Sequence, residues 1–448
     1  KTCKGIIFKT SGSYEITAQR PLIENLDSIN IPNRKNLSID NKYSFLPTMI
    51  TGRGCTGKCA FCYEGRKNEG GKKLRLNSAE RCIKEFNYLS DGIKKGYICI
   101  LDDTFVADTK RLKEFCKELT INHKGKIKWF CEARVDTLVR FPDILPMMIE
   151  AGLIRLQVGG ESGSQEVLNS YKKEITLDQI TAAVDLAKKS GLLSIFINFI
   201  IGGAHETKST FEKTKKLALE LLNRAPGCVS IGSSFFTPYP GTPMNDNPNE
   251  YGIEILDEEV VTGFGDKHVF CRTKELSKYE ILEMGYSFNQ ELNKNMMKLS
   301  KHLPKEIIEK HYEAFYKYDL STEWYECLSS NLTIDSYYKS RYQAKTKKFG
   351  SIRKNELLNS YPIRNVSLIS SSNKKYLIPI YDGSIIALDE LESILLELSS
   401  GKLTFREICD TLTNSFSNLP PEKLYKAIRD RYSKFDKEYL VVWKNNIN

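Results

Sequence analysis

The chain has 448 residues, of which 41% are hydrophobic and 27% are charged, and its formal net charge is +10. This length predicts two or three globular domains, and no apolar run approaches the roughly 20 residues of a membrane span. Twelve cysteines over this length are too sparse for a disulfide scaffold, so we expect mostly free thiols in a reducing compartment, the cytoplasm. The positive charge favours an anionic partner, either a nucleic acid or an acidic peptide.

Strand-like and helix-like segments alternate between residues 44 and 245. Their apolar residues recur at spacings typical of strands and of helices that pack on a sheet. Such alternation predicts an α/β fold, here a partial (β/α)6 barrel with a parallel sheet. The predicted strands are 45–50, 97–101, 127–131, 154–158, 195–201 and 229–236, and the clearest helices are 78–89, 109–119, 177–189 and 207–222.

The first predicted strand leads into a glycine-rich run that contains three closely spaced cysteines. Cys55, Cys59 and Cys62 follow the spacing C-x3-C-x2-C. Three thiolates on a four-iron cluster leave one iron open for chemistry, whereas a zinc site usually takes a fourth Cys or His nearby. No such fourth ligand follows at short spacing. The alternatives are a zinc knuckle or three unrelated buried thiols, and the spacing favours a [4Fe–4S] cluster.

Polar residues and glycines collect where the predicted strands end. Active sites of α/β barrels form at the carboxyl ends of the strands, so these side chains are expected to meet. Helix capping explains one polar residue at a strand end, but it does not explain several strands in succession. In chain order the candidates are Asp102, Asp103, Glu132, Arg134, Glu161, Ser162, Asn198 and Gly202, followed by the run 237–243.

The cysteine run and these strand-end segments resemble the radical S-adenosylmethionine (SAM) enzymes, in particular a branch that commonly carries a cobalamin-binding domain before the barrel. The resemblance implies that SAM binds the open iron, with Phe61 near its adenine and Arg134 on its carboxylate. Asp102 or Asp103 would face the SAM amino group. The remaining implied contacts are Glu161 and Ser162 to the ribose or methionine portion, Gly202 to the adenine, and Glu132 and Asn198 as further cofactor-binding residues. The chain departs from the branch at Ala204 and His205, where Pro-Gly is usual.

Residues 1–43 resemble the tail of a cobalamin-type domain and the linker into the barrel. An Asp-x-His-x-x-Gly motif, whose histidine would coordinate cobalt, does not occur in the sequence. Cobalamin is therefore left uncertain, without support from the residues present.

The βα alternation ends after residue 245. We expect a helical extension and linker over 246–360, with helices at 277–299 and 304–318. The run 337–354 is rich in Tyr, Lys and Arg, and a solvated helix with a linker is favoured there over a nucleic-acid patch.

Three short strands (366–370, 376–381 and 384–388), three helices (389–398, 404–415 and 421–435) and a closing strand (439–443) are predicted in residues 361–448. The segments 379–389 and 395–408 resemble the small winged-helix domain that recognises leader peptides in ribosomal peptide natural-product pathways. That resemblance implies a precursor peptide as partner, added as a strand to a sheet edge. DNA binding or a packing role are the alternatives.

The family resemblance implies that SAM is cleaved to a 5′-deoxyadenosyl radical, which abstracts a substrate hydrogen. An epimerase would then need a hydrogen donor, for which a cysteine thiol is suited. Cys271, in a polar segment after the sixth unit, is the first candidate, although free cysteines are often small buried hydrophobes. Cys327 is the second candidate.

We therefore expect a cytoplasmic radical SAM peptide epimerase that makes D-residues. Its partners would be a precursor peptide and an electron donor such as flavodoxin or ferredoxin, without a membrane and without nucleic acid. The first alternative is a cobalamin-dependent radical SAM methyltransferase. The second is a nucleic-acid-binding iron–sulfur protein.

Overall fold

Contacts within the chain divide it into two compact units, Lys1–Leu292 and Asn293–Asn448. The predicted boundaries at residues 43, 245 and 360 remain predictions. Among the helices of the described residues, none has both the length and the apolar character needed to cross a bilayer. The computed structural model describes residues 3–34, 47–64, 74–91, 96–256, 268–370, 376–379 and 385–445, with only the backbone for strands within 369–387.

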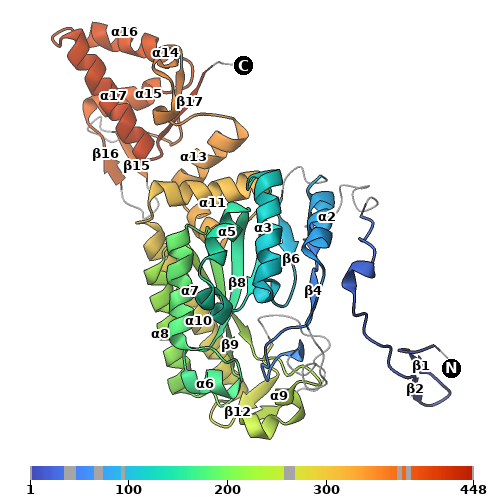
Figure 1. Cartoon of the computed structure of the whole chain (residues 1–448). Helices are drawn as coiled ribbons and strands as arrows, with labels where there is room; N and C mark the ends of the chain where they lie inside the picture. The colour runs from blue at the N-terminus through green and yellow to red at the C-terminus, as the bar shows by residue number, and fades with distance from the viewer. Residues whose placement is uncertain are drawn as a thin grey trace. The chain divides into compact units, whose positions relative to one another are not determined.

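A six-stranded parallel sheet forms the centre of the first unit (Figure 1). Its order, β10-β9-β8-β7-β6-β3, places successive strands side by side, as in a barrel that does not close. All six predicted strands are confirmed, and their pairings are parallel throughout. The strands are β3 (Thr48–Met49), β6 (Ile98–Ile100), β7 (Trp129–Ala133), β8 (Leu153–Glu161), β9 (Ser194–Ile201) and β10 (Val229–Phe235).

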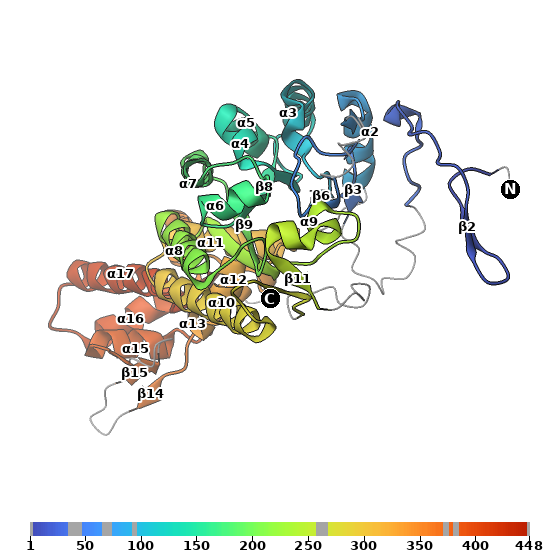
Figure 2. The same cartoon turned by 90° about the horizontal axis from the view of Figure 1, so that it is seen from below.

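Helices cover the outer side of this sheet, which Figure 2 shows from below. Several begin at a residue whose side chain accepts a hydrogen bond from the third backbone amide of the helix, such as Ser78, Asp108 and Thr176. This cap satisfies a donor that would otherwise lack a partner, and therefore marks where the helix starts. The helices are α2 (Ala79–Ser90), α3 (Thr109–His123), α4 (Val135–Arg140), α5 (Ile144–Glu150), α6 (Gln165–Ser170), α7 (Leu177–Ser190) and α8 (Lys208–Arg224).

Short elements surround this core. Two-stranded antiparallel sheets pair β1 with β2, β4 with β5, and β11 with β12. The chain leaves β10 through α9 and passes into the long helix α10. The bounds are β1 (Ile7–Lys9), β2 (Tyr14–Ile16), η1 (Leu26–Ser28), β4 (Gly52–Arg53), β5 (Arg75–Leu76), η4 (Phe105–Ala107), α9 (Pro243–Asp246), η5 (Pro248–Tyr251), β11 (Ile253–Ile255), β12 (Cys271–Thr273) and α10 (Lys278–Ser300).

The second unit combines helices with two small antiparallel sheets, β13-β17 and β14-β15-β16. The predicted strands and helices of the last 88 residues are present, together with β13, which was not predicted; the expected Asp382-Gly383 turn lies outside the described residues. The elements are α11 (Lys305–Tyr318), α12 (Glu323–Ser329), α13 (Leu332–Gln343), η7 (Phe349–Ser351), α14 (Lys354–Leu357), β13 (Tyr361–Arg364), β14 (Ile369–Ser370), β15 (Tyr376–Pro379), β16 (Ile385–Ala387), α15 (Glu390–Leu398), α16 (Phe405–Ser415), α17 (Pro421–Lys437) and β17 (Val441–Lys444).

The tyrosine-rich segment of α13 is part of the core of this unit, so the expected solvated helix is wrong there. Tyr337 and Tyr338 are fully buried, and the Tyr338 ring stacks on Tyr312 with 4.3 Å between ring centroids. Arg341 on the same helix donates to Glu309 at 2.9 Å. Because these side chains are engaged inside the unit, they do not form a basic surface for nucleic acid.

Trp324 in α12 tests this core. Its side chain is fully buried, so Trp324→Ala should lower the free energy of unfolding by about 3–5 kcal/mol through the cavity it leaves. Leu332→Ala, at a side chain that is 81% exposed, should change it by less than about 0.5 kcal/mol. Urea unfolding followed by circular dichroism measures both, and equal effects would contradict the assignment.

Candidate functional site

The three cysteines of the C-x3-C-x2-C run lie together on the wall of one pocket, of about 490 Å³, in the first unit. Backbone hydrogen bonds hold their loop in place. The amide of Ala60 donates to the carbonyl oxygen of Tyr171 at 2.8 Å, and the Ala60 carbonyl oxygen accepts from the amide of Met244 at 3.1 Å. The loop is therefore attached to the segments that follow β8 and β10.

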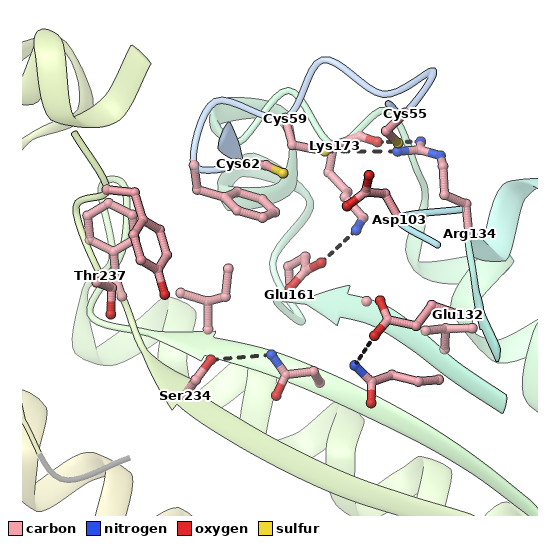
Figure 3. Close-up of a pocket in the computed structure, with 18 of the residues that line it drawn as sticks. Cys55, Cys59, Cys62, Asp103, Glu132, Arg134, Glu161, Lys173, Ser234 and Thr237 are labelled. Atoms are coloured by element: carbon pink, nitrogen blue, oxygen red, sulfur yellow. Dashed lines mark hydrogen bonds and ion pairs between the residues drawn. The ribbon is translucent and has the colours of Figure 1, made fainter. Parts of the chain in front are cut away.

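Figure 3 shows the cysteines on one side of this pocket and Ser234 and Thr237 on another, with Glu132, Glu161 and Lys173 between them. Most of the lining comes from the carboxyl ends of strands, as the barrel geometry predicts. The lining residues are Cys55, Cys59, Phe61, Cys62, Asp103, Glu132, Ala133, Arg134, Gln157, Val158, Gly159, Glu161, Lys173, Asn198, Ile200, Ser234, Phe235, Phe236, Thr237 and Tyr239.

Arg134 connects the end of β7 to the cysteine loop. Its guanidinium forms an ion pair with Asp136 at 3.0 Å, donates to the carbonyl oxygen of Lys173 at 2.8 Å, and lies 3.9 Å from the sulfur of Cys59. A Cβ atom at Gly57 would come within 2.8 Å of this guanidinium. Glycine at position 57 is therefore what lets the loop approach Arg134.

Glu161 and Lys173 form a buried ion pair within the pocket, with 2.6 Å between Oε1 and Nζ. A Cβ at Gly159 would lie 2.0 Å from that carboxylate oxygen, so a side chain at this position would displace the ion pair. Lys173 was not predicted from the sequence, because a lysine among the charged residues after a short helix carries no distinguishing signal.

Two pairs of hydrogen-bonded side chains also line the pocket. Gln157 donates to Glu132 at 3.3 Å, and Asn198 donates to Ser234 at 3.3 Å. Burial, reinforced by the carboxylate of Asp103, raises the pKa of Glu132. Gln157 was not predicted, although it lies two residues before Gly159 on the same strand, and strand alternation could have identified it.

Phe61 also lines the pocket, where its ring meets Tyr171 edge to face with 5.3 Å between centroids. Of the predicted cofactor-binding residues, the structure thus places Phe61, Asp103, Glu132, Arg134, Glu161 and Asn198 around the three cysteines.

Three of the predicted cofactor-binding residues instead support the surrounding structure. Asp102 is buried, accepts from the amide and hydroxyl of Thr51, and forms an ion pair with Arg111. Ser162 is buried and shares a hydrogen bond with Thr214. None of these residues lines the pocket.

Gly202 is the third of them. At its positive φ of 78°, an added Cβ would lie 2.7 Å from Ile281 of α10, so the glycine allows helix packing rather than access to an adenine.

Neither predicted hydrogen donor lies in the pocket. Cys271 is 1% exposed, and burial raises the pKa of its thiol to about 12, so the expectation of an accessible thiol is wrong. The polar residues next to Cys271 in the sequence lie in β12 and just before it. The side chain of Cys271 itself packs with Tyr171 and Met244. Cys327 is partly buried in α12 of the second unit, where it lines another cavity.

The donor set fits a cluster better than a single ion. No group of three or more His, Cys, Asp or Glu side chains in the described part of the chain is arranged to hold one metal ion. Thiolates bound to a cube each reach a different iron, so they need not converge on a point. Three thiols around an open pocket would hold a [4Fe–4S] cluster with one iron facing the lining residues.

The two neighbouring aspartates allow a direct comparison. Asp102→Asn should lower the free energy of unfolding by about 3 kcal/mol or more, because Arg111 stays buried without its charged partner. The affinity for SAM should stay unchanged. Asp103→Asn should leave stability nearly unchanged and weaken SAM about tenfold. Thermal unfolding and anaerobic calorimetric titration with SAM separate the two effects, and the reverse pattern would contradict these assignments.

Glu206, at the turn after β9, makes the stability dependent on pH. Burial raises its pKa to about 7 from 4.5, against the opposing effect of the Gly202 and Gly203 amides. The folded state then binds the proton more tightly than the unfolded state, so stability falls by about 3 kcal/mol as the pH rises between these values. Glu206→Gln should remove this fall, as measured by denaturant unfolding at about pH 5 and about pH 8. An unchanged pH dependence in the variant would contradict the assignment.

Comparisons with known proteins agree with this geometry. Residues 49–218 match the radical SAM superfamily. The uncharacterized methyltransferase PH0819 of Pyrococcus horikoshii is 36% identical over 245 residues, covering 53% of this chain and 50% of the relative. The anaerobic magnesium-protoporphyrin IX monomethyl ester cyclase of Cereibacter sphaeroides is 27% identical over 259 residues, covering 57% and 41%. The chain thus spans half or less of the length of these relatives.

Among solved structures, the cobalamin-dependent SAM radical enzyme OxsB, with aqua-cobalamin and SAM bound, is similar in fold, with a TM-score of 0.50 at 16% identity over 76% of this chain and 51% of that one. Residues 49–218 therefore form a domain that matches the radical SAM superfamily, and this match implies a [4Fe–4S] cluster and SAM.

Proposed function

We propose that this chain is the radical SAM part of an enzyme that takes a hydrogen atom from its substrate and replaces it with a methyl group. The observation that carries the first half is the single pocket that Cys55, Cys59 and Cys62 share with Arg134 and Glu161. When bound there, a reduced [4Fe–4S] cluster supplies an electron to SAM, whose cleavage yields a 5′-deoxyadenosyl radical that attacks unactivated C–H bonds.

The pocket residues have separate roles in this proposal. The three thiolates hold the cluster, and the guanidinium of Arg134, beside the cysteine loop, binds the SAM carboxylate. Asp103 faces the amino group, while Glu132 and Asn198 bind hydroxyl or adenine groups. Apolar side chains, including Val158, exclude water and stray hydrogen donors from the reacting atoms.

Methylation is favoured over epimerisation for two reasons. The relative with 36% identity is named a methyltransferase. In addition, no thiol other than the three of the cysteine loop appears in the described lining of the pocket, so the hydrogen donor expected of an epimerase is missing from that lining. The sequence has no Asp-x-His-x-x-Gly motif, so a cobalamin required for methylation is not assigned to a site among its residues.

A peptide epimerase is the second candidate, and the second unit motivates it. The predicted strands β14, β15 and β16 and helices α15, α16 and α17 are all present. A precursor peptide could add to such a sheet as a further strand, in either reaction. An acidic flavodoxin or ferredoxin would suit the net charge of +10 as electron donor, in a reducing cytoplasm.

The first test is reductive SAM cleavage by the anaerobically reconstituted chain with dithionite. The wild type should release 5′-deoxyadenosine, and Cys59→Ala should release almost none, because the cluster loses a ligand. Cys409→Ala is the matched control, since this partly buried thiol lies in α16, and it should match the wild type. A cluster-loaded wild type that releases no 5′-deoxyadenosine contradicts the proposal.

The second test separates the two reactions. A candidate precursor peptide is treated with the enzyme and SAM that carries a deuterated methyl group, with and without hydroxocobalamin, and in parallel with ordinary SAM in deuterated water. Mass spectrometry showing the labelled methyl group on the peptide supports methylation. A single solvent deuteron gained without a methyl group supports the epimerase instead.

A further inference from the structure

Lys173 is a buried cation on the wall of the pocket that carries the cysteines. Its ammonium bonds to Glu161, and it lies 5.9 Å from the centroid of the Phe61 ring, next to Cys62 in the chain. Figure 3 shows the side chain pointing from the side of the cysteine loop toward Glu161. Burial alone would lower the pKa of Lys173, but the Glu161 carboxylate and Cys59 raise it, so the group keeps its charge.

The backbone around this ion pair is held in an unusual conformation. Glu161 has a φ of 61°, and Lys172 and Glu174, on either side of Lys173, have φ values of 50° and 56°. Non-glycine residues rarely adopt this left-handed region, and each one costs energy. The end of helix α6 explains Lys172, because the amide of Lys173 donates to the carbonyl oxygen of Leu168. No helix ends at Glu161, so there the left-handed backbone belongs to the residue that carries the ion pair.

A structural role explains the pair poorly. Buried ion pairs are weak contributors to stability, because removing two charges from water costs about as much as their attraction returns. The absence of a side chain at Gly159 leaves the space in which both charged groups lie. The neighbouring cysteines supply a better reason.

Lys173 and Arg134 are the two cations in the described lining of the pocket, whose wall also carries the three cysteines. Arg134 is compensated by Asp136, and Lys173 by Glu161. The electrostatic balance at the cysteine loop is thus set by two cations, each with its own carboxylate.

We propose that Lys173 keeps the cluster held by Cys55, Cys59 and Cys62 reducible by offsetting the Glu161 carboxylate, which by itself would lower the reduction potential. This inference rests on the proposed function, because it requires that cluster. Reduction adds one negative charge to a cluster that three thiolates already make anionic. A cation fixed nearby at low dielectric stabilises the reduced form more than the oxidised form. Lys173 therefore makes reduction easier, and the Glu161 carboxylate limits how much.

The test is an anaerobic redox titration of the reconstituted chain without SAM, followed by electron paramagnetic resonance of the reduced cluster. Lys173→Met should lower the ratio of reduced to oxidised cluster at a given potential about tenfold, a shift of about 59 mV. Lys173→Arg, which keeps the charge, should match the wild type. The double variant Lys173→Met with Glu161→Gln removes both charges together, so its midpoint should return close to that of the wild type.

Lys172→Met is the matched control, since this lysine is the neighbour of Lys173 in the chain but is exposed to water. It should leave the midpoint potential unchanged. A Lys173→Met protein with full iron and sulfide content and the wild-type midpoint overturns the inference. A double variant that stays as low as the single variant also overturns it, because packing rather than charge would then be the cause.

Failure of the proposed function is recognised separately. A wild-type chain that assembles no cluster overturns both proposals. A wild type that binds the cluster and releases 5′-deoxyadenosine, alongside an unshifted Lys173→Met midpoint, overturns only the role of the ion pair.

Discussion

The backbone of Ala60 connects the cysteine loop to the barrel, and the rest of the site depends on that connection. Its amide and carbonyl bond to Tyr171, after β8, and Met244, after β10. These two segments reach the loop only because parallel strands deliver their carboxyl ends to one edge. The loop geometry, and with it the spacing of three thiols around an open pocket, is thus a property of the assembled sheet.

Charge is distributed within the site by pairing. Arg134 is compensated by Asp136, Lys173 by Glu161, and Arg111 by Asp102. Because isolated buried charges are very costly, each of these carboxylates offsets the charge of the cation beside it. The pairs differ in position. The Asp102 pair is hydrogen-bonded to Thr51, just before the cysteine loop, whereas Arg134, Lys173 and Glu161 of the other two line the pocket beside the cysteines.

The cysteines illustrate how much environment decides chemistry. The three in the loop border an open pocket, while Cys271 is enclosed among apolar side chains. A buried thiol with a raised pKa is a small hydrophobe, whatever the polarity of its neighbours in sequence. An epimerase needs a thiol that returns a hydrogen atom to the substrate, and Cys271 is too enclosed for that role. The difference therefore favours methylation over epimerisation.

Sequence alone determined the six strands and singled out three cysteines as candidate cluster ligands, because apolar periodicity and close cysteine spacing are local signals. It also placed polar residues at the strand ends. Only the tertiary structure decided which of them face the pocket. Asp102 and Asp103 are adjacent in the chain, but Asp103 lines the pocket while Asp102 is bound to Thr51 and Arg111. Tyr337 lies in a segment that the sequence predicts to be solvated, but it is buried in the core of its unit. The sequence around Lys173 does not indicate that this lysine reaches the pocket. Its position there depends on the hydrogen bond from Arg134 to its carbonyl oxygen and on its ion pair with Glu161.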